Sequence, residues 1–110
     1  MVGLVCSDGV ILAAEKNLLS KLQCKSSDQR IFTVEQDIGL GIQGRIPDGM
    51  IVLSRARSEC ENYKDNFGVP IPGEILAERL ANFVHAHTLY GAYRPLGCEI
   101  FLSCKDANSQ

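Results

Sequence analysis

Two histidines are the first residues to consider for metal or acid–base chemistry. His85 and His87 stand two positions apart in a segment with helical periodicity. Residues two apart on an α-helix point about 200° away from each other, because each residue advances the helix by about 100°. The pair therefore cannot chelate one metal ion together. We expect His87 to be a hydrogen-bonded residue of the apolar face, and we predict no metal site and no catalytic histidine.

Serine and cysteine offer no recognisable nucleophile. The sequence lacks Gly-x-Ser-x-Gly, the strained turn that presents a catalytic serine. The five cysteines are an odd number and include no Cys-x-x-Cys pair, which differs from a disulfide framework or a zinc site. We interpret them as reduced thiols that act as small core hydrophobes in a reducing compartment.

A glycine pattern suggests a nucleotide site at first sight. Gly39, Gly41 and Gly44 match the letters Gly-x-Gly-x-x-Gly, but dinucleotide-binding glycines form a turn after a strand within a βαβ unit. Here the glycines fall mostly inside a predicted strand, so we interpret them as a close backbone approach and a tight strand-to-helix corner. Asp48 would repel a phosphate at that corner, and we predict a structural role for it at the helix start. No cofactor is predicted.

One charged residue, Arg30, follows a loop rich in serine and aspartate and opens a predicted strand. Its planar guanidinium suits bidentate binding of a carboxylate. The alternatives are a solvated charge at the strand end and an internal ion pair. Taken without other information, the residues favour these alternatives.

The elements that position these residues come in blocks. Apolar runs on both sides of Asp8-Gly9 predict a β-hairpin. Period-two alternation and continuous apolar runs predict the other strands, and three- and four-residue spacing predicts two helices. The expected strands cover 2–6, 10–14, 30–34, 38–42 and 96–104, and the expected helices cover 47–66 and 73–90. This order predicts an α+β fold with helices layered on antiparallel sheet.

The helical spacing also assigns a buried side to each helix. For the first helix it selects Met50, Leu53, Arg57 and Cys60, and it places Glu59 on the solvent side. For the second helix the expected buried residues are Leu76, Leu80, Phe83 and His87. Gly91 is expected to end the second helix in a left-handed conformation.

The totals exclude several classes of protein. Eleven basic residues are scattered among 13 acidic ones, so the chain lacks the basic stripe that a nucleic-acid-binding protein needs. The apolar runs are far too short to span a bilayer, and no secretory signal is visible. We therefore predict neither a nucleic-acid nor a membrane partner. Positions 106–110 look like the tip of a hairpin without its return strand, and we expect a fragment of a longer chain.

A series of motifs, in this order and spacing, resembles the alpha-type subunits of the 20S proteasome. The motifs are Val2-Gly3, Asp8-Gly9, Arg30-Ile-Phe-Thr-Val34, Gly44-Arg-Ile-Pro-Asp48, Ala56-Arg57-Ser58-Glu59, Asn66-Phe67-Gly68, Val84-His-Ala86 and Arg94-Pro95-x-Gly97-Cys98. The resemblance implies a four-layer α-β-β-α sandwich of the N-terminal-nucleophile hydrolase type, of which about half is present. Residues 1–110 would form a single incomplete domain that lacks the N-terminal gating helix and the C-terminal half.

The resemblance also implies that this chain does not hydrolyse peptides. Related beta subunits use an N-terminal threonine as nucleophile and a lysine at the start of the third strand to tune it. Here the sequence starts Met1-Val2-Gly3, and Arg30, too basic to accept a proton, stands at the lysine position. The implied function is a non-catalytic structural and gating subunit of the alpha ring. The alternatives are an active N-terminal-nucleophile peptidase or amidohydrolase, and a truncated product without activity.

Partners follow from the same resemblance. They would be the other alpha subunits of a heteroheptameric ring, beta-ring subunits, and the C-terminal tails of a regulatory particle or activator. Arg30 is the expected activator-tail residue, because the equivalent basic residue of the family pairs with a tail carboxylate. The implied role in ubiquitin-dependent protein degradation predicts a location in cytoplasm and nucleus.

Overall fold

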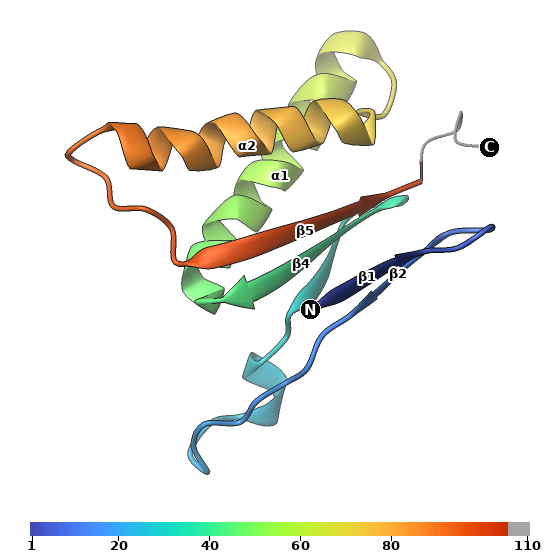
Figure 1. Ribbon diagram of the computed structural model, residues 1–110. Helices are drawn as coiled ribbons and strands as arrows, with labels where there is room; N and C mark the ends of the chain where they lie inside the picture. The colour runs from blue at the N-terminus through green and yellow to red at the C-terminus, as the bar shows by residue number, and fades with distance from the viewer. Residues whose placement is uncertain (106–110) are drawn as a thin grey trace.

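The computed structural model describes residues 1–105 and arranges them in three layers (Figure 1). Two helices, α1 (Ile46–Phe67) and α2 (Gly73–Leu89), cover one face of a three-stranded antiparallel sheet. That sheet has the order β3 (Ile31–Glu35), β4 (Ile38–Gly44), β5 (Cys98–Cys104). The hairpin β1–β2 lies on its opposite face (Figure 1). The α+β prediction is confirmed, and these layers follow the helix–sheet–sheet order of the expected sandwich.

The first hairpin forms where its turn residues predict it. Strand β1 (Val2–Val5) pairs antiparallel with β2 (Val10–Ala13), and the Cys6 N–H donates to the carbonyl of Gly9 at 2.7 Å to close the turn. A short 3₁₀ turn, Lys25–Ser27, interrupts the long loop that follows. The expected hairpin tip at 106–110 lies outside the described residues.

Strand β4 has one helix-facing side and one hairpin-facing side. Its residues Ile38, Leu40 and Ile42 are buried under the helices. Gly39 and Gly41 alternate with them, and a Cβ on Gly41 would collide with the side chain of Met1. The glycines therefore let the two sheets approach closely, as the sequence predicts.

The core lies between the helices and the three-stranded sheet. Leu53, Leu76 and Leu80 are buried as predicted, Phe83 is half-buried against the core, and His87 is half-buried beside Phe83. The full set of buried apolar residues is Ile38, Leu40, Ile42, Val52, Leu53, Ala56, Cys60, Ile71, Leu76 and Leu80. No helix within residues 1–105 is both long and apolar enough to cross a membrane.

The predicted buried side of α1 is partly wrong. Met50 is 42 % exposed and Arg57 is also exposed, whereas Glu59, expected in solvent, is only 7 % exposed. Relative to the predicted orientation, α1 is rotated about its own axis. Gly49 packs directly on Ile42, and a Cβ at position 49 would collide with the isoleucine side chain. This contact brings the start of α1 close to β4 and turns the Glu59 side toward α2.

The ends of the two helices differ in mechanism. Gly68, with φ of 70°, ends α1 in the left-handed conformation, and its N–H donates to the carbonyl of Lys64 at 2.8 Å. The equivalent expectation for Gly91 is wrong. Helix α2 ends at Leu89 because Tyr90 is already extended, with φ of −104° and ψ of 131°.

Candidate functional site

The backbone segments approach one another closely at the corner where β4 ends, α1 begins and β5 begins. Gly44 has φ of 90°, and a Cβ there would lie 2.7 Å from the carbonyl oxygen of Gly97. The next residue, Arg45, donates its backbone N–H to that same carbonyl at 2.9 Å. Only glycine fits at position 44, because the backbone is left-handed and crosses the start of β5 closely.

Asp48 is the centre of this corner. The residue is 2 % exposed and lies in the first turn of α1. Arg94 donates from Nη1 to Oδ2 at 2.8 Å and from Nη2 to Oδ1 at 2.7 Å. The Gly97 N–H donates to Oδ2 at 2.8 Å. These three hydrogen bonds, which we call the Asp48 cluster, tie the connection between α2 and β5 to the start of α1.

The electrostatics of the Asp48 cluster keep the carboxylate ionised. The hydrogen bond from Arg94, and then that from Gly97, hold the pKa of Asp48 well below its usual range, while burial opposes this effect. The same hydrogen bond raises the pKa of Arg94. A carboxylate this acidic is a poor general base at neutral pH, so the cluster serves to fix the loop rather than to move protons.

Arg30 lies beside the same corner in an internal ion pair. Its Nε is 3.3 Å from Oδ1 of Asp28, a residue that is 2 % exposed. Its Nη1 lies 3.5 Å from the carbonyl oxygen of Gly44. The side chain of Arg30 remains 19 % exposed. The ion pair is one of the two alternatives that the sequence favoured, and the role in tail docking stays a prediction.

The two histidines diverge as helical geometry predicts. His87 Nδ1 lies 3.0 Å from the carbonyl oxygen of Phe83, so this nitrogen carries the proton. The His87 ring also packs against Phe83 and Tyr93, with centroid distances of 4.8 and 5.3 Å. His85 is exposed and contacts Thr88. Within residues 1–105, no three potential ligand side chains are grouped around a point where a metal ion would bind.

A second charged cluster joins the two helices. Glu59 of α1 accepts a hydrogen bond from Arg79 of α2 at 2.8 Å and forms an ion pair with Arg55 one turn earlier. The hydrogen bond from Arg79 is the main cause that lowers the pKa of Glu59. Arg79 also lies over the ring of Tyr63, at 5.5 Å from its centroid. The cluster explains how a glutamate is buried between the helices.

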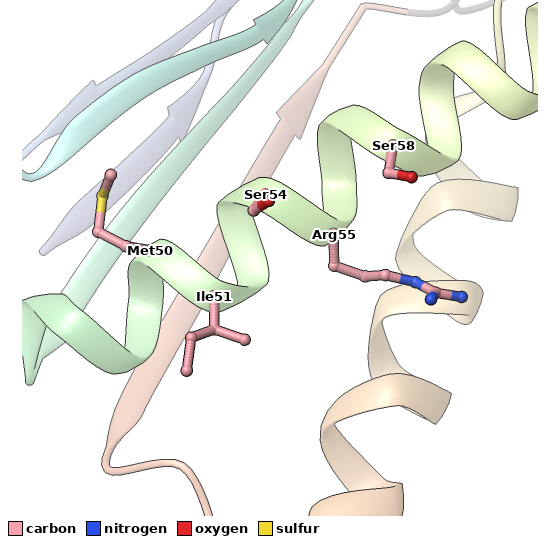
Figure 2. Close-up of a pocket in the computed structure, with 5 residues that line it drawn as sticks. All are labelled: Met50, Ile51, Ser54, Arg55 and Ser58. Carbon is pink, nitrogen blue, oxygen red and sulfur yellow. The ribbon is translucent and has the colours of Figure 1, made fainter.

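The outward side of α1 carries a shallow apolar hollow. Its volume is about 540 Å³, and Figure 2 shows its lining side chains along the helix, with Arg55 reaching toward α2. Met50 and Ile51 are 42 % and 48 % exposed. The residues that line it are Met50, Ile51, Ser54, Arg55 and Ser58. The hollow therefore presents two exposed apolar side chains beside a charged one.

The cysteines divide into two groups. Cys60 is buried, and burial, together with Glu35, raises the pKa of its thiol to about 11. Burial also raises the pKa of Cys98. Cys6 and Cys24 are exposed, so the prediction that all cysteines act as core residues is wrong for these two. Both lie outside the helix-covered core, one at the β1 turn and one in the long loop.

Sequence reasoning missed the partners of Asp48 and Glu59. Asp48 was expected at the helix start, but its contact with Arg94 spans 46 positions, and no local periodicity reports such a pair. The available signal was the Arg94-Pro95-x-Gly97 connection, in which an arginine and a glycine frame the start of a strand. For Glu59 nothing in the sequence indicated a buried ion pair, and the polarity of the residue predicted a position in solvent.

Comparison with known proteins places these features in a family. A family model described as proteasome subunit matches residues 1–110. The chain is 43 % identical over 107 residues to "Proteasome subunit alpha type-3" of Acanthamoeba castellanii and 41 % identical over 103 residues to the protein of that name from Dictyostelium discoideum. It is also 43 % identical over 106 residues to "Probable proteasome subunit alpha type-7" of Schizosaccharomyces pombe. These alignments cover 97, 94 and 96 % of this chain and 42 % of each relative.

Proposed function

The chain belongs to the proteasome subunit family, and we propose that it works as a non-catalytic structural and gating subunit of the alpha ring of the 20S core particle. The observation that carries this proposal is the similarity of nearly the whole chain to relatives named as alpha subunits. The chain spans about two fifths of the length of those relatives, each alignment covering 42 % of the relative. The proposed role therefore concerns the longer protein.

The absence of catalysis is supported by the state of Arg30. This residue stands where the resemblance places the lysine of the active beta subunits. Its guanidinium is held by Asp28 and cannot accept a proton at physiological pH. Asp48, at the start of α1, accepts hydrogen bonds from Arg94 and from the Gly97 N–H. The corner therefore holds ion pairs that stay charged at neutral pH, and such groups are poorly suited to exchanging protons with a substrate.

Ring assembly is supported by the outward side of α1. Met50 and Ile51 present apolar surface that the described residues leave exposed. Arg55 borders the same hollow and forms an ion pair with Glu59. This ion pair fixes the Arg55 side chain in the unbound protein. We propose that this side contacts a beta-ring subunit or another alpha subunit. Such a subunit would act in ubiquitin-dependent protein degradation in the cytoplasm and nucleus.

Activator docking at Arg30 is a further part of the proposal. The side chain lies at an exposed corner and retains 19 % exposure despite its ion pair. Replacing Arg30 with alanine in an assembled ring should weaken binding of an activator tail and leave ring assembly intact. Unchanged tail binding would remove Arg30 from the docking surface.

The test of the overall proposal is incorporation into core particles. The full-length protein, tagged and produced in its own cells, should purify with alpha and beta subunits, and native mass spectrometry should find it in the alpha ring. The isolated protein should not cleave fluorogenic peptides. A protein that stays outside core particles, or that cleaves peptides alone and is blocked by a reagent for N-terminal nucleophiles, would contradict the proposal and favour the hydrolase alternative.

A further inference from the structure

Strand β3 lies at one edge of the three-stranded sheet, and within residues 1–105 no other strand pairs with its outer side. The Ile42 N–H of β4 donates to the carbonyl of Arg30, just before β3, at 2.7 Å. Because backbone groups of successive residues alternate in direction along an antiparallel strand, Ile31 and Thr33 turn their N–H and C=O groups away from β4. These two residues therefore form the free edge of the sheet.

Both outward carbonyls of this edge accept a hydrogen bond from a side chain. Arg57 of α1 donates from Nη2 to the carbonyl of Thr33 at 2.9 Å. Gln29, in the loop before β3, donates from Nε2 to the carbonyl of Ile31 at 2.9 Å. We call Arg57 and Gln29 the edge caps of β3. The pairing register of β3 with β4 also shifts between Thr33 and Glu35, and such irregularities bend an edge strand away from neighbours.

The residue types of β3 make an uncovered edge hazardous. Positions 31–34 read Ile-Phe-Thr-Val, four residues that favour strands and carry no charge. A free edge of this composition is a template to which another chain can add a strand. The cap also explains an unexpected exposure. Helical spacing placed Arg57 on the buried side of α1, but its side chain is exposed and reaches the edge of the sheet.

We propose that the edge caps keep the β3 strands of two copies of this chain from pairing with each other. A second strand needs the carbonyls of Ile31 and Thr33 as acceptors, so its N–H groups compete with the edge caps for them. Two copies joined through β3 would also bring both Arg57 side chains to the seam, where like charges repel. A side chain without charge or donors at position 57 removes both effects.

The experiment uses the full-length protein, purified free of other subunits, over a range of concentrations. Hydrogen exchange at the amides of Ile31 and Thr33 reports pairing of this edge, because free N–H groups exchange quickly and those in a ladder are protected. Arg57→Met removes the charge and the donors but keeps an unbranched side chain, whereas Arg57→Lys keeps the charge and a donor. Lys64→Met, at an exposed position of the same helix, is the control for loss of one positive charge.

Arg57→Met should protect the two amides at about 10-fold lower protein concentration than wild type, because a charge-assisted hydrogen bond and a like-charge repulsion are both lost. Arg57→Lys and Lys64→Met should behave as wild type does. Gln29→Ala removes the other cap without altering a helix and should shift the concentration less, in the same direction. This variant also tests the inference if circular dichroism shows that Arg57→Met does not fold.

A proline at position 33 gives the decisive control. The Thr33 N–H faces away from β4, so Thr33→Pro removes a donor that the sheet itself does not use. Added to Arg57→Met, Thr33→Pro should abolish the concentration-dependent protection at Ile31. Equal exchange in wild type and the variants without caps, or protection that persists in the presence of Thr33→Pro, would overturn the inference.

Discussion

Asp48 and Arg94 are 46 positions apart in the chain and are joined by two hydrogen bonds of 2.7 and 2.8 Å. Arg94 is 59 % exposed at its side chain, whereas Asp48 is 3 % exposed. The pair therefore connects the surface of the α2–β5 connection to the base of α1. Together with the hydrogen bond from Gly97, it ties the residues just before β5 to the first turn of α1.

Replacing Asp48 with asparagine should destabilise the protein. The variant keeps the shape of the side chain but removes the charge that two donors of Arg94 and the Gly97 N–H share. We expect the thermal midpoint to fall by about 5–10 °C. Differential scanning fluorimetry of the purified protein measures this change. Asp65→Asn, at an exposed position of α1, is the control, and an equal loss in both variants would contradict the role of the cluster.

The contribution of Asp48 should depend on pH in one direction. Because the folded-state pKa of Asp48 is held well below the unfolded value of about 4, the ionised carboxylate stabilises the fold above that value. This stability is lost progressively as the pH falls below about 4 toward the folded pKa. Urea unfolding of wild type and Asp48→Asn should therefore differ most at pH 7 and converge in acid. A difference that grows on acidification would refute the assignment.

Glu59→Gln should weaken the contact between α1 and α2. The neutral amide keeps one hydrogen bond at most and loses the charge that binds Arg55 and Arg79. Since Arg79 is 40 % exposed and Arg55 49 %, we expect a moderate loss of about 1 kcal/mol in the free energy of unfolding. Chemical denaturation measures it. Glu61→Gln, two positions further along the same helix and exposed, should change stability much less.

Gly49→Ala should be costly although alanine favours helices. The added Cβ would overlap the side chain of Ile42, which is buried at the centre of β4. We expect a loss of about 1–3 kcal/mol in the free energy of unfolding. Gly91→Ala is the matched control, because no atom lies within 4 Å of a Cβ at that position. Comparable effects of the two substitutions would show that the close approach of α1 to β4 does not limit the fold.

Met50→Asp or Ile51→Asp should reduce incorporation into core particles. Each substitution places a charge in the hollow on the outward side of α1. The side chains replaced are already exposed there, so they contribute little to the stability of the fold. Native gels of cell extracts should show less of the variant in particles and more of it free. Asn62→Asp, also exposed on α1, should assemble normally. Normal assembly of both hollow variants would exclude this side as a subunit contact.

The elements themselves could be predicted from the sequence because their signals are local. Asp8-Gly9 between apolar runs predicted the β1–β2 hairpin, and Gly68 before two prolines predicted the end of α1. Turn chemistry, helix ends and residue alternation act over a few neighbouring residues, so the chain alone determines them. The α+β class and the family resemblance also came from order and spacing along the chain.

The tertiary structure alone decided which charges meet and which side of α1 is buried. Glu59 is buried because Arg79 of α2 reaches it, and Met50 is exposed because Gly49 lets the helix rotate onto Ile42. Likewise Asp48 is held by Arg94, which follows both helices in the chain. The polarity of a single residue does not predict whether that residue is buried or which charge it pairs with. The free-energy cost of burying a charge depends on partners that only the folded chain brings near.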